Sequence, residues 1–193
     1  MAREATAASR TRLRDVCLGV NRDIERLVEY AADFSGRRLG PLRRLSFLLM
    51  PPIQCALLYR LSHWLHSHGR RGLACQLARV NYVLHKSAIS PAARIGPGLY
   101  VPHTVGVVFQ AHAGDNLTLY AWSKVVPPVI RHWDGEVPGD APRLGSGVTV
   151  GVGTVVVGPI TVPDGTHLRA CSVLMAPAAT NTAGASLHTA EDA

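Results

Sequence analysis

Apolar residues recur at steps of three and four in the N-terminal half of the chain, a pattern that predicts amphipathic helices. The first helix is expected over residues 13–31, where one face carries Leu13, Val16, Val20, Ile24, Leu27, Val28 and Ala31. The opposite, polar face is expected to carry Arg22, Asp23, Arg26 and Glu29. Gly36 and Gly40-Pro41 then break the pattern. This spacing predicts a helix with one side on the protein and the other in solvent.

Three further apolar segments follow before residue 86. The run Leu42 to Met50 stops at Pro51-Pro52, and proline suits the first turn of a helix, so a third helix is expected from about Pro52 to Ser67. A fourth is expected from Leu73 to about Leu84, with an apolar side made of Leu73, Leu77, Val80, Val83 and Leu84. Aromatic and arginine side chains at helical spacing pack against neighbouring helices, and we interpret the segment Tyr59-Arg60-Leu61-Ser62-His63-Trp64 in that way.

From residue 89 onward, aliphatic residues recur every six positions instead. A first series comprises Ile89, Ile95, Val101, Val107, Ala113, Leu119 and Val125, and a second comprises Leu144, Val150, Val156, Val162, Leu168 and Leu174. A period of six is typical of a solenoid with three short strands per coil. Gly, Asn and Asp follow many of these steps and tolerate the positive φ of a sharp corner. The pattern predicts a triangular prism of parallel strands with the aliphatic side chains stacked inside.

The two patterns divide the chain into a helical domain over residues 1–86 and a repeat domain over 87–178. The period lapses over residues 126–143, which are rich in proline and glycine and predict a loop that leaves the prism. This excursion loop contains Arg131, His132, Trp133, Asp134, Glu136 and Asp140, and loops on rigid scaffolds often carry function. Residues 179–193 are expected to form a flexible tail.

Composition and charge exclude several classes of protein. The formal net charge of +7 divides into +9 for residues 1–86 and −2 for residues 87–193, and no helix-turn-helix or aromatic-interleaved signature accompanies the basic half. No apolar stretch is long enough to cross a membrane, and no secretory signal is visible, so we expect a cytoplasmic protein without nucleic-acid or membrane partners. The cysteines, Cys17, Cys55, Cys75 and Cys171, form no Cys-x-x-Cys pair and are expected to be free, mostly buried thiols.

Two segments resemble the serine O-acetyltransferase family. One is Leu58-Tyr59-Arg60-Leu61-Ser62-His63-Trp64-Leu65, and the other runs from Ile89 through Ala93-Arg94-Ile95-Gly96 to Pro102-His103. The resemblance covers about residues 40–178. It implies an α+β fold, in which an α-helical domain precedes a left-handed parallel β-helix of hexapeptide repeats. It also implies a homotrimer, often paired into a dimer of trimers, that transfers acetyl from acetyl-CoA to the hydroxyl of serine on the route to cysteine.

His103 is the candidate catalytic residue. Acylating an alcohol with a thioester needs a base for the hydroxyl proton, and a neutral histidine has a suitable pKa. His103 matches the family's catalytic histidine, although it could instead simply fill a corner of the coil. No serine or cysteine nucleophile is apparent, so direct transfer is expected. The resemblance places the CoA thiol arm along Gly151, Val152, Gly153, Ala170 and Cys171, while corner geometry alone explains Gly151 and Gly153 equally well.

Several positions depart from the family pattern. The carboxylate that orients the catalytic imidazole should stand fifteen residues earlier, where this chain has Ala88. Candidate substitutes are Asp134, Glu136 and Asp140 in the excursion loop. The family's Arg-His pair before a later proline is here Asp140-Ala141, and Arg131 and His132 are the candidate replacements for substrate binding. These changes predict weaker transfer unless another carboxylate reaches the histidine.

Other departures concern the substrates. Arg37 stands near the position of a family carboxylate that helps to hold the serine amino group, with only Asp33 nearby. The segment Tyr120-Ala121-Trp122-Ser123-Lys124 is bulkier than in the family and would crowd pantetheine. His112 stands where the family has a small residue, and its interpretation as an exposed coil residue or as a functional one remains open.

Two hypotheses follow. The first is an acetyl-CoA-dependent O-acetyltransferase acting on serine or on a related amino acid or metabolite. The alternative is a catalytically impaired paralogue that serves as a trimeric scaffold or regulatory subunit. A metal-dependent hydratase is rejected, because His103, His112 and His132 contain no pair five residues apart, and no metal is expected. Docking to cysteine synthase is not expected, since the family's docking tail ends in isoleucine and this chain ends Glu191-Asp192-Ala193.

Overall fold

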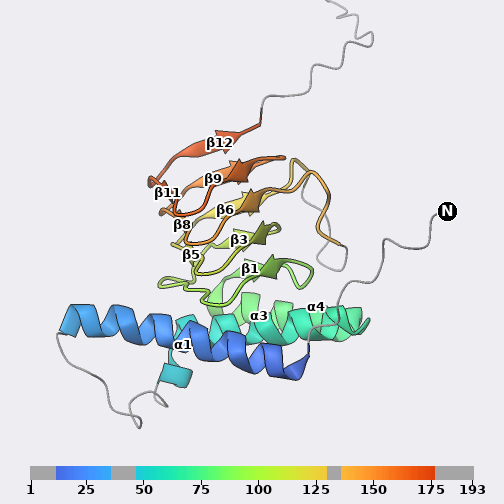
Figure 1. Ribbon diagram of the computed structural model, residues 1–193. Helices are drawn as coiled ribbons and strands as arrows, with labels where there is room; N and C mark the ends of the chain where they lie inside the picture. The colour runs from blue at the N-terminus through green and yellow to red at the C-terminus, as the bar shows by residue number, and fades with distance from the viewer. Residues whose placement is uncertain (1–11, 36–46, 130–135, 177–193) are drawn as a thin grey trace, which may run out of the picture.

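The computed structural model describes residues 12–35, 47–129 and 136–176, with helices at one end of a stack of short strands (Figure 1). The helical part contains α1 (Leu13–Ser35), the 3₁₀ helix η1 (Phe47–Leu49), α3 (Pro51–Ser67) and α4 (Arg71–His85). These bounds confirm the helices predicted over 13–31, 52–67 and 73–84. Of the apolar run Leu42 to Met50, residues 42–46 lie outside the described residues, and the remainder enters η1.

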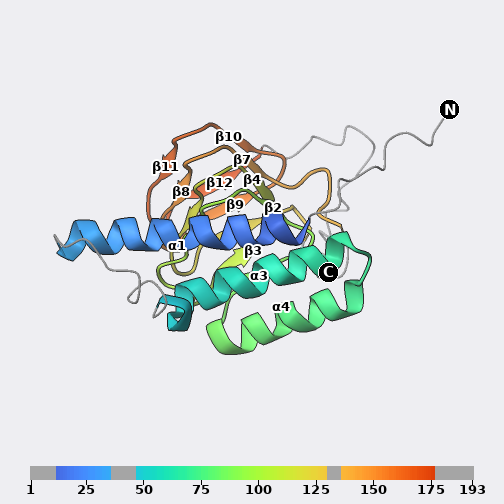
Figure 2. The same ribbon diagram turned by 60° about the horizontal axis from the view of Figure 1, so that its bottom comes forward.

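Helices α1, α3 and α4 lie side by side across the base of the strand stack (Figure 2). Helix α3 begins after Met50, which is extended, and Pro51 and Pro52 fill the first turn, where no backbone N–H needs a partner. The helix ends at Ser67 with His68 as its C-cap, and Gly69 follows in the left-handed conformation with φ of +76°. Proline at its start and glycine past its end therefore define α3, as the sequence predicts.

The apolar side predicted for the fourth helix is not the buried side. Leu73, Val80, Val83 and Leu84 are exposed, whereas the buried residues of α4 are Ala74, Ala78, Asn81 and His85. Small alanine side chains let α4 approach α3 closely, and Asn81 donates a hydrogen bond from Nδ2 to the carbonyl oxygen of Cys55 at 3.1 Å. The pattern located the helix, but close packing on α3 determined its buried face.

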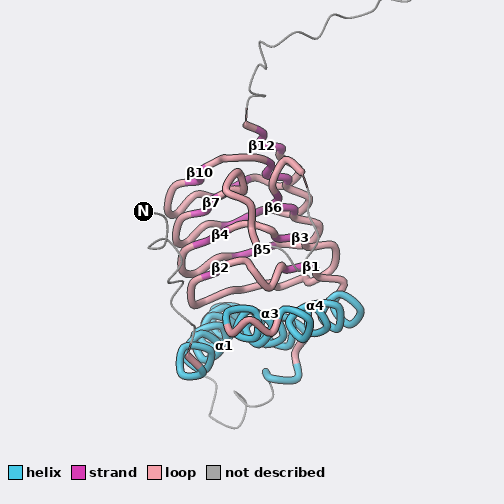
Figure 3. Tube along the Cα trace, turned by 90° about the vertical axis from the view of Figure 1, so that its right-hand side faces the viewer, coloured by secondary structure: helices cyan, strands magenta, loops and turns pink. Residues whose placement is uncertain are grey.

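The repeat domain is built from very short parallel strands. They are β1 (Ala88–Ile89), β2 (Arg94–Ile95), β3 (Val108–Phe109), β4 (His112–Ala113), β5 (Thr118–Leu119), β6 (Lys124–Val126), β7 (Arg143–Leu144), β8 (Thr149–Val150), β9 (Val155–Val157), β10 (Thr161–Val162), β11 (His167–Leu168) and β12 (Val173–Met175). They form three sheets in the orders β1-β3-β6-β9-β12, β2-β4-β7-β10 and β5-β8-β11. The turns from β3 to β11 each contribute one strand to each sheet, whereas the first coil joins the third sheet only through an isolated parallel bridge from Tyr100 to Thr118. Figure 3 shows the coils stacked on one another. The predicted prism is confirmed.

The predicted six-residue register is wrong in the first coils. Ile89 pairs with Phe109 rather than Val107, and Phe109 pairs with Val125, so consecutive coils advance by twenty and then sixteen residues instead of eighteen. Two residues are added between Val101 and Phe109, and two are missing between Phe109 and Ala113. From residue 144 the prediction holds, because Leu144 pairs with Val162 and Val156 with Leu174. The added residues enlarge the turn that carries His103.

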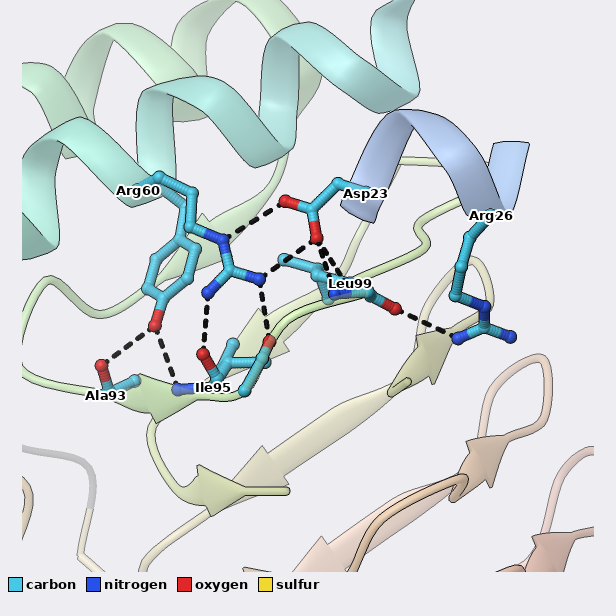
Figure 4. Close-up of polar contacts among 9 residues, drawn as sticks. Asp23, Arg26, Arg60, Ala93, Ile95 and Leu99 are labelled. Carbon is cyan, nitrogen blue, oxygen red and sulfur yellow. Dashed lines mark hydrogen bonds and ion pairs between the residues drawn. The ribbon is translucent and has the colours of Figure 1, made fainter. Parts of the chain in front are cut away.

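An ion pair buried between helix and prism fixes their relative position (Figure 4). Asp23 of α1 accepts hydrogen bonds from Arg60 Nε at 3.1 Å and Nη2 at 3.0 Å. The same guanidinium donates to the carbonyl oxygens of Ile95 and Gly96 at 2.6 and 2.7 Å. The packing role expected for the Tyr59–Trp64 segment is thus confirmed for Arg60.

Asp23 is the residue that the helix pattern misplaced. Its side chain is fully buried, although the sequence put it on the polar face, and its Oδ1 accepts the backbone N–H groups of Gly98 and Leu99 at 2.9 and 2.7 Å. Burial raises the pKa of the Asp23 carboxyl, and the guanidinium of Arg60 limits that rise. Asp23 lies seven residues after Val16 and four before Leu27, so it shares one helical face with these two buried residues, a signal that could have located it.

The structure bears on two expectations from the sequence, one about the burial of the cysteines and one about membrane-spanning helices. The cysteines are not mostly buried: only Cys55 is, whereas Cys75 is half-buried and Cys17 and Cys171 are exposed. Burial raises the pKa of the Cys55 thiol to about 11. Among the described residues, no helix is both long and apolar enough to span a membrane.

Candidate active site

His103 lies in the enlarged turn between Tyr100, which forms an isolated parallel bridge with Thr118, and β3, and its side chain is exposed. Within the described part of the chain, no residue forms a hydrogen bond or ion pair with its imidazole. Ala88, the position of the missing carboxylate, is buried at the start of β1 and pairs with Val108. A methyl group cannot accept the second N–H of an imidazole, so His103 lacks the orienting partner that the family pattern predicts.

Neither of the two described candidates, Glu136 and Asp140, binds His103 in this structure. Glu136 is 77% exposed and forms an ion pair with Arg71 of α4, Oε1 to Nη2 3.5 Å. Asp140 is exposed and makes no ion pair with a described residue. Asp134 lies outside the described residues, as do Arg131, His132 and Arg37, and the side chain of Asp33 is not described either. Substrate binding by Arg131 and His132 therefore stays a prediction.

The five predicted CoA-binding residues are brought together at one edge of the prism. Gly153 donates its N–H to the carbonyl oxygen of Ala121 at 2.9 Å, and Cys171 donates to Val152 at 2.7 Å. Gly153 and Cys171 are left-handed, with φ of +68° and +58°. Val152, Ala170 and Cys171 are exposed. This edge therefore presents backbone and small side chains to solvent over two successive coils.

Corner packing accounts for Gly151 independently of any ligand. A Cβ built there would lie 2.6 Å from the backbone nitrogen of Ala170 and 2.7 Å from the carbonyl oxygen of Leu168. Both atoms are backbone and cannot turn aside, so no side chain fits between the two coils. The packing interpretation, left open by the sequence, is sufficient for this glycine.

The turn of His103 belongs to the same edge. Gly106, three residues after the histidine, is left-handed with φ of +74°. Its N–H donates to the carbonyl oxygen of Lys86 at 2.9 Å. On the next coil, Trp122 donates its N–H to the carbonyl oxygen of Val105, also at 2.9 Å. The order along the edge is therefore the His103 turn, Trp122, the Val152-Gly153 corner and the Ala170-Cys171 corner.

His112 has a structural role that the sequence left open. Its Nδ1 accepts a hydrogen bond from the backbone N–H of Arg94 at 3.2 Å, which leaves the proton of the neutral ring on Nε2. Burial, followed by the charges of Arg94 and Arg143, lowers the pKa of His112. Among the described residues, no group of three His, Cys, Asp or Glu side chains is placed to hold a metal ion. The expectation of no metal stays a prediction.

Comparison with known proteins places the chain in a family. No family model matches it. A serine acetyltransferase from Helicobacter pylori is 33% identical over 147 residues, which are 74% of this chain and 82% of that protein. This chain belongs to the serine acetyltransferase family. The Salmonella typhimurium serine acetyltransferase is 33% identical over 128 residues, 66% of this chain, and the match spans only 45% of that longer relative.

Solved serine acetyltransferase structures have the same fold. The Brucella abortus enzyme superposes with a TM-score of 0.68 at 23% identity, over 84% of this chain and 64% of that one. A second Brucella abortus structure, in complex with coenzyme A, gives a TM-score of 0.67 at 25% identity, over 84% and 63%. The fold class is thereby confirmed as an α-helical domain followed by a left-handed parallel β-helix.

Proposed function

We propose that this protein is an acetyl-CoA-dependent O-acetyltransferase that acetylates the hydroxyl of serine or of a related amino acid or metabolite. The observation that carries the proposal is the shared edge of the prism, on which the His103 turn lies in line with Gly151, Val152, Gly153, Ala170 and Cys171. An extended thiol arm needs a track of bare backbone and small side chains. The Val152-Gly153 and Ala170-Cys171 corners provide such a track, which leads past Trp122 toward the exposed His103. Membership of the serine acetyltransferase family supports the same reaction.

In the proposed reaction the imidazole of His103 accepts the proton of the acceptor hydroxyl as its oxygen attacks the thioester carbonyl carbon. The C–S bond then breaks, and the departing CoA thiolate takes the proton back from His103. Acetyl passes directly from donor to acceptor, so no covalent acyl-enzyme forms. Because Ala88 gives His103 no orienting carboxylate, the tautomer of the ring is less defined and transfer should be slower than with such a partner.

The proposed assembly is a homotrimer in the cytoplasm. The exposed position of His103 supports an assembly, since a second subunit against this edge would exclude water from the reacting groups. Sedimentation velocity tests it, and a purely monomeric species at assay concentration would contradict the trimer. Sedimentation velocity would also distinguish a single trimer from a dimer of trimers.

The deciding experiment measures CoA release from acetyl-CoA by wild type and by His103→Ala with serine, homoserine, threonine or no acceptor. His167→Ala is the matched control, because His167 is also an exposed histidine of the prism but belongs to β11. We expect acceptor-dependent release that His103→Ala reduces about 100-fold or more, the scale of general base catalysis, and that His167→Ala leaves unchanged. Equal rates for wild type and His103→Ala would contradict the assigned base.

The second candidate is a catalytically impaired family member that acts as a trimeric scaffold or regulatory subunit. It is favoured by Ala88 and by the lack of a described side-chain partner for His103. Calorimetric titration with acetyl-CoA separates the two proposals. Absence of binding together with absence of turnover favours the scaffold, whereas binding without turnover means that the acceptor lies outside the tested set.

A further inference from the structure

Trp122 has a backbone conformation that is rare for a bulky residue. Its φ is +62°, in the left-handed region that favours glycine and asparagine. At the equivalent corners before and after it in the stack, this edge has glycine, at Gly106 and Gly153. Strained conformations persist where the surrounding structure holds them and often mark functional positions. A tryptophan at this corner therefore needs an explanation beyond the geometry of the turn.

The indole ring is seated on Gly106. A Cβ at Gly106 would overlap the ring, so the glycine provides the space that the indole occupies. The backbone N–H of Trp122 is fixed to Val105 at 2.9 Å, yet the residue stays 58% exposed. The ring is thus placed beside the turn of His103, and within one subunit much of its surface is uncovered.

The indole stands between the two halves of the proposed site. On one side, Trp122 donates its backbone N–H to Val105 in the turn of His103. On the other side, the neighbouring residue Ala121 accepts the N–H of Gly153 from the next coil. Neighbouring parallel strands are about 4.8 Å apart, so the Gly153 corner lies roughly 10 Å from the Gly106 corner, with Trp122 halfway. A thiol arm that follows this edge toward His103 therefore passes the indole before its acyl group reaches the histidine.

We propose that Trp122 is a specificity-determining residue that restricts the acyl donor to acetyl-CoA. This inference rests on the proposed acetyltransferase function and adds a donor preference to it. On this proposal an acetyl methyl group passes the exposed ring, whereas the longer chains of propionyl and butyryl groups would meet the indole. Replacing the indole with a small residue that accepts positive φ removes the obstruction without straining the corner.

The test compares calorimetric dissociation constants for acetyl-CoA and butyryl-CoA, a measurement that needs no acceptor. The variants are Trp122→Gly and Trp122→Asn, since both residues tolerate φ above zero. Asn116→Gly is the matched control, because Asn116 is left-handed on the same coil, at the edge of Gly98 and Gly147. One methylene changes selection by roughly 10–200-fold, so we expect both Trp122 variants to improve butyryl-CoA binding relative to acetyl-CoA by about 10-fold or more. The Asn116 variant should keep the wild-type ratio.

The possible failures are distinguishable. If wild type binds acetyl-CoA and the Trp122 variants keep the wild-type ratio, the specificity inference is wrong and the proposed function stands. If wild type binds neither thioester, both are wrong. Loss of the folded state in both Trp122 variants, measured by thermal unfolding, would assign the ring a purely structural role and overturn the inference. Where turnover is found, the ratios of kcat/KM for the two donors should move in the same direction.

Discussion

Removal of the Asp23 carboxylate should destabilise the protein more than any exposed charge change on α1. Asp23→Ala leaves the Arg60 guanidinium buried without its counter-charge, which typically costs about 3–5 kcal/mol. It also removes the acceptor for the N–H groups of Gly98 and Leu99, and a buried orphaned donor costs about 1–3 kcal/mol. These contributions are not additive, and we expect a loss of about 4 kcal/mol or more.

Such a loss is a large share of the roughly 5–15 kcal/mol that stabilises a typical domain. With a urea dependence of about 2 kcal/mol per molar, it moves the unfolding midpoint down by about 2 M. Asp23→Asn keeps an oxygen for the two N–H groups but no charge for Arg60, so it should fall between wild type and Asp23→Ala. Urea titration followed by far-ultraviolet circular dichroism measures all three proteins.

Arg22→Ala is the matched control for Asp23. Arg22 is the adjacent residue and pairs with Glu25 and Glu29 at 3.2 and 3.0 Å, but on the solvent side of α1. Exposed pairs of this kind contribute about 0–1 kcal/mol. If Asp23→Ala loses no more stability than Arg22→Ala, the buried ion pair does not hold the helix on the prism, and the reasoning from Figure 4 fails.

Two further predictions concern coil packing and pH. Gly151→Ala should lower the free energy of unfolding by about 1–3 kcal/mol, because its Cβ meets the backbone of the next coil. Gly139 has open space around it, so Gly139→Ala should change that free energy by no more than about 0.5 kcal/mol in the same urea titration. Equal losses for the two variants would contradict the packing account. Burial lowers the pKa of His63, whose Nδ1 donates to the Pro91 carbonyl, so folding loses stability as pH falls below about 6.5, the value for the unfolded chain. His63→Gln should reduce that loss, which thermal unfolding between pH 7 and pH 5 measures; an identical pH dependence in wild type and variant would assign the loss to other histidines whose pKa burial lowers, namely His66, His85 and His112.

Regular parts of this fold are predictable because one short-range rule governs many residues. The six-residue period locates the prism, and its later coils follow the rule without exception. Faces of helices are harder to predict, because burial depends on the partner as well as on the period. Helix α4 exposes Leu84 and buries Ala78 since the neighbouring helix accepts only a small side chain at close approach. Asp23 was misplaced for a related reason, since a buried carboxylate is stable only with the cation that Arg60 brings from a distant segment.

The candidate site lies where the six-residue period is interrupted, and there is a physical reason for this coincidence. A regular coil uses each inward position for the core and each corner for a tight turn, which leaves little freedom to place a reacting group. Two added residues between Val101 and Phe109 release His103 from that constraint, and the two residues missing before Ala113 restore the register. The scaffold is specified because the period, the corner residues and the core positions all predict the same coil. The turn that bears His103 departs from this pattern by two added residues, and the two missing residues compensate for them. On this argument, Trp122 is a second such violation on the same edge, one of backbone conformation rather than of length.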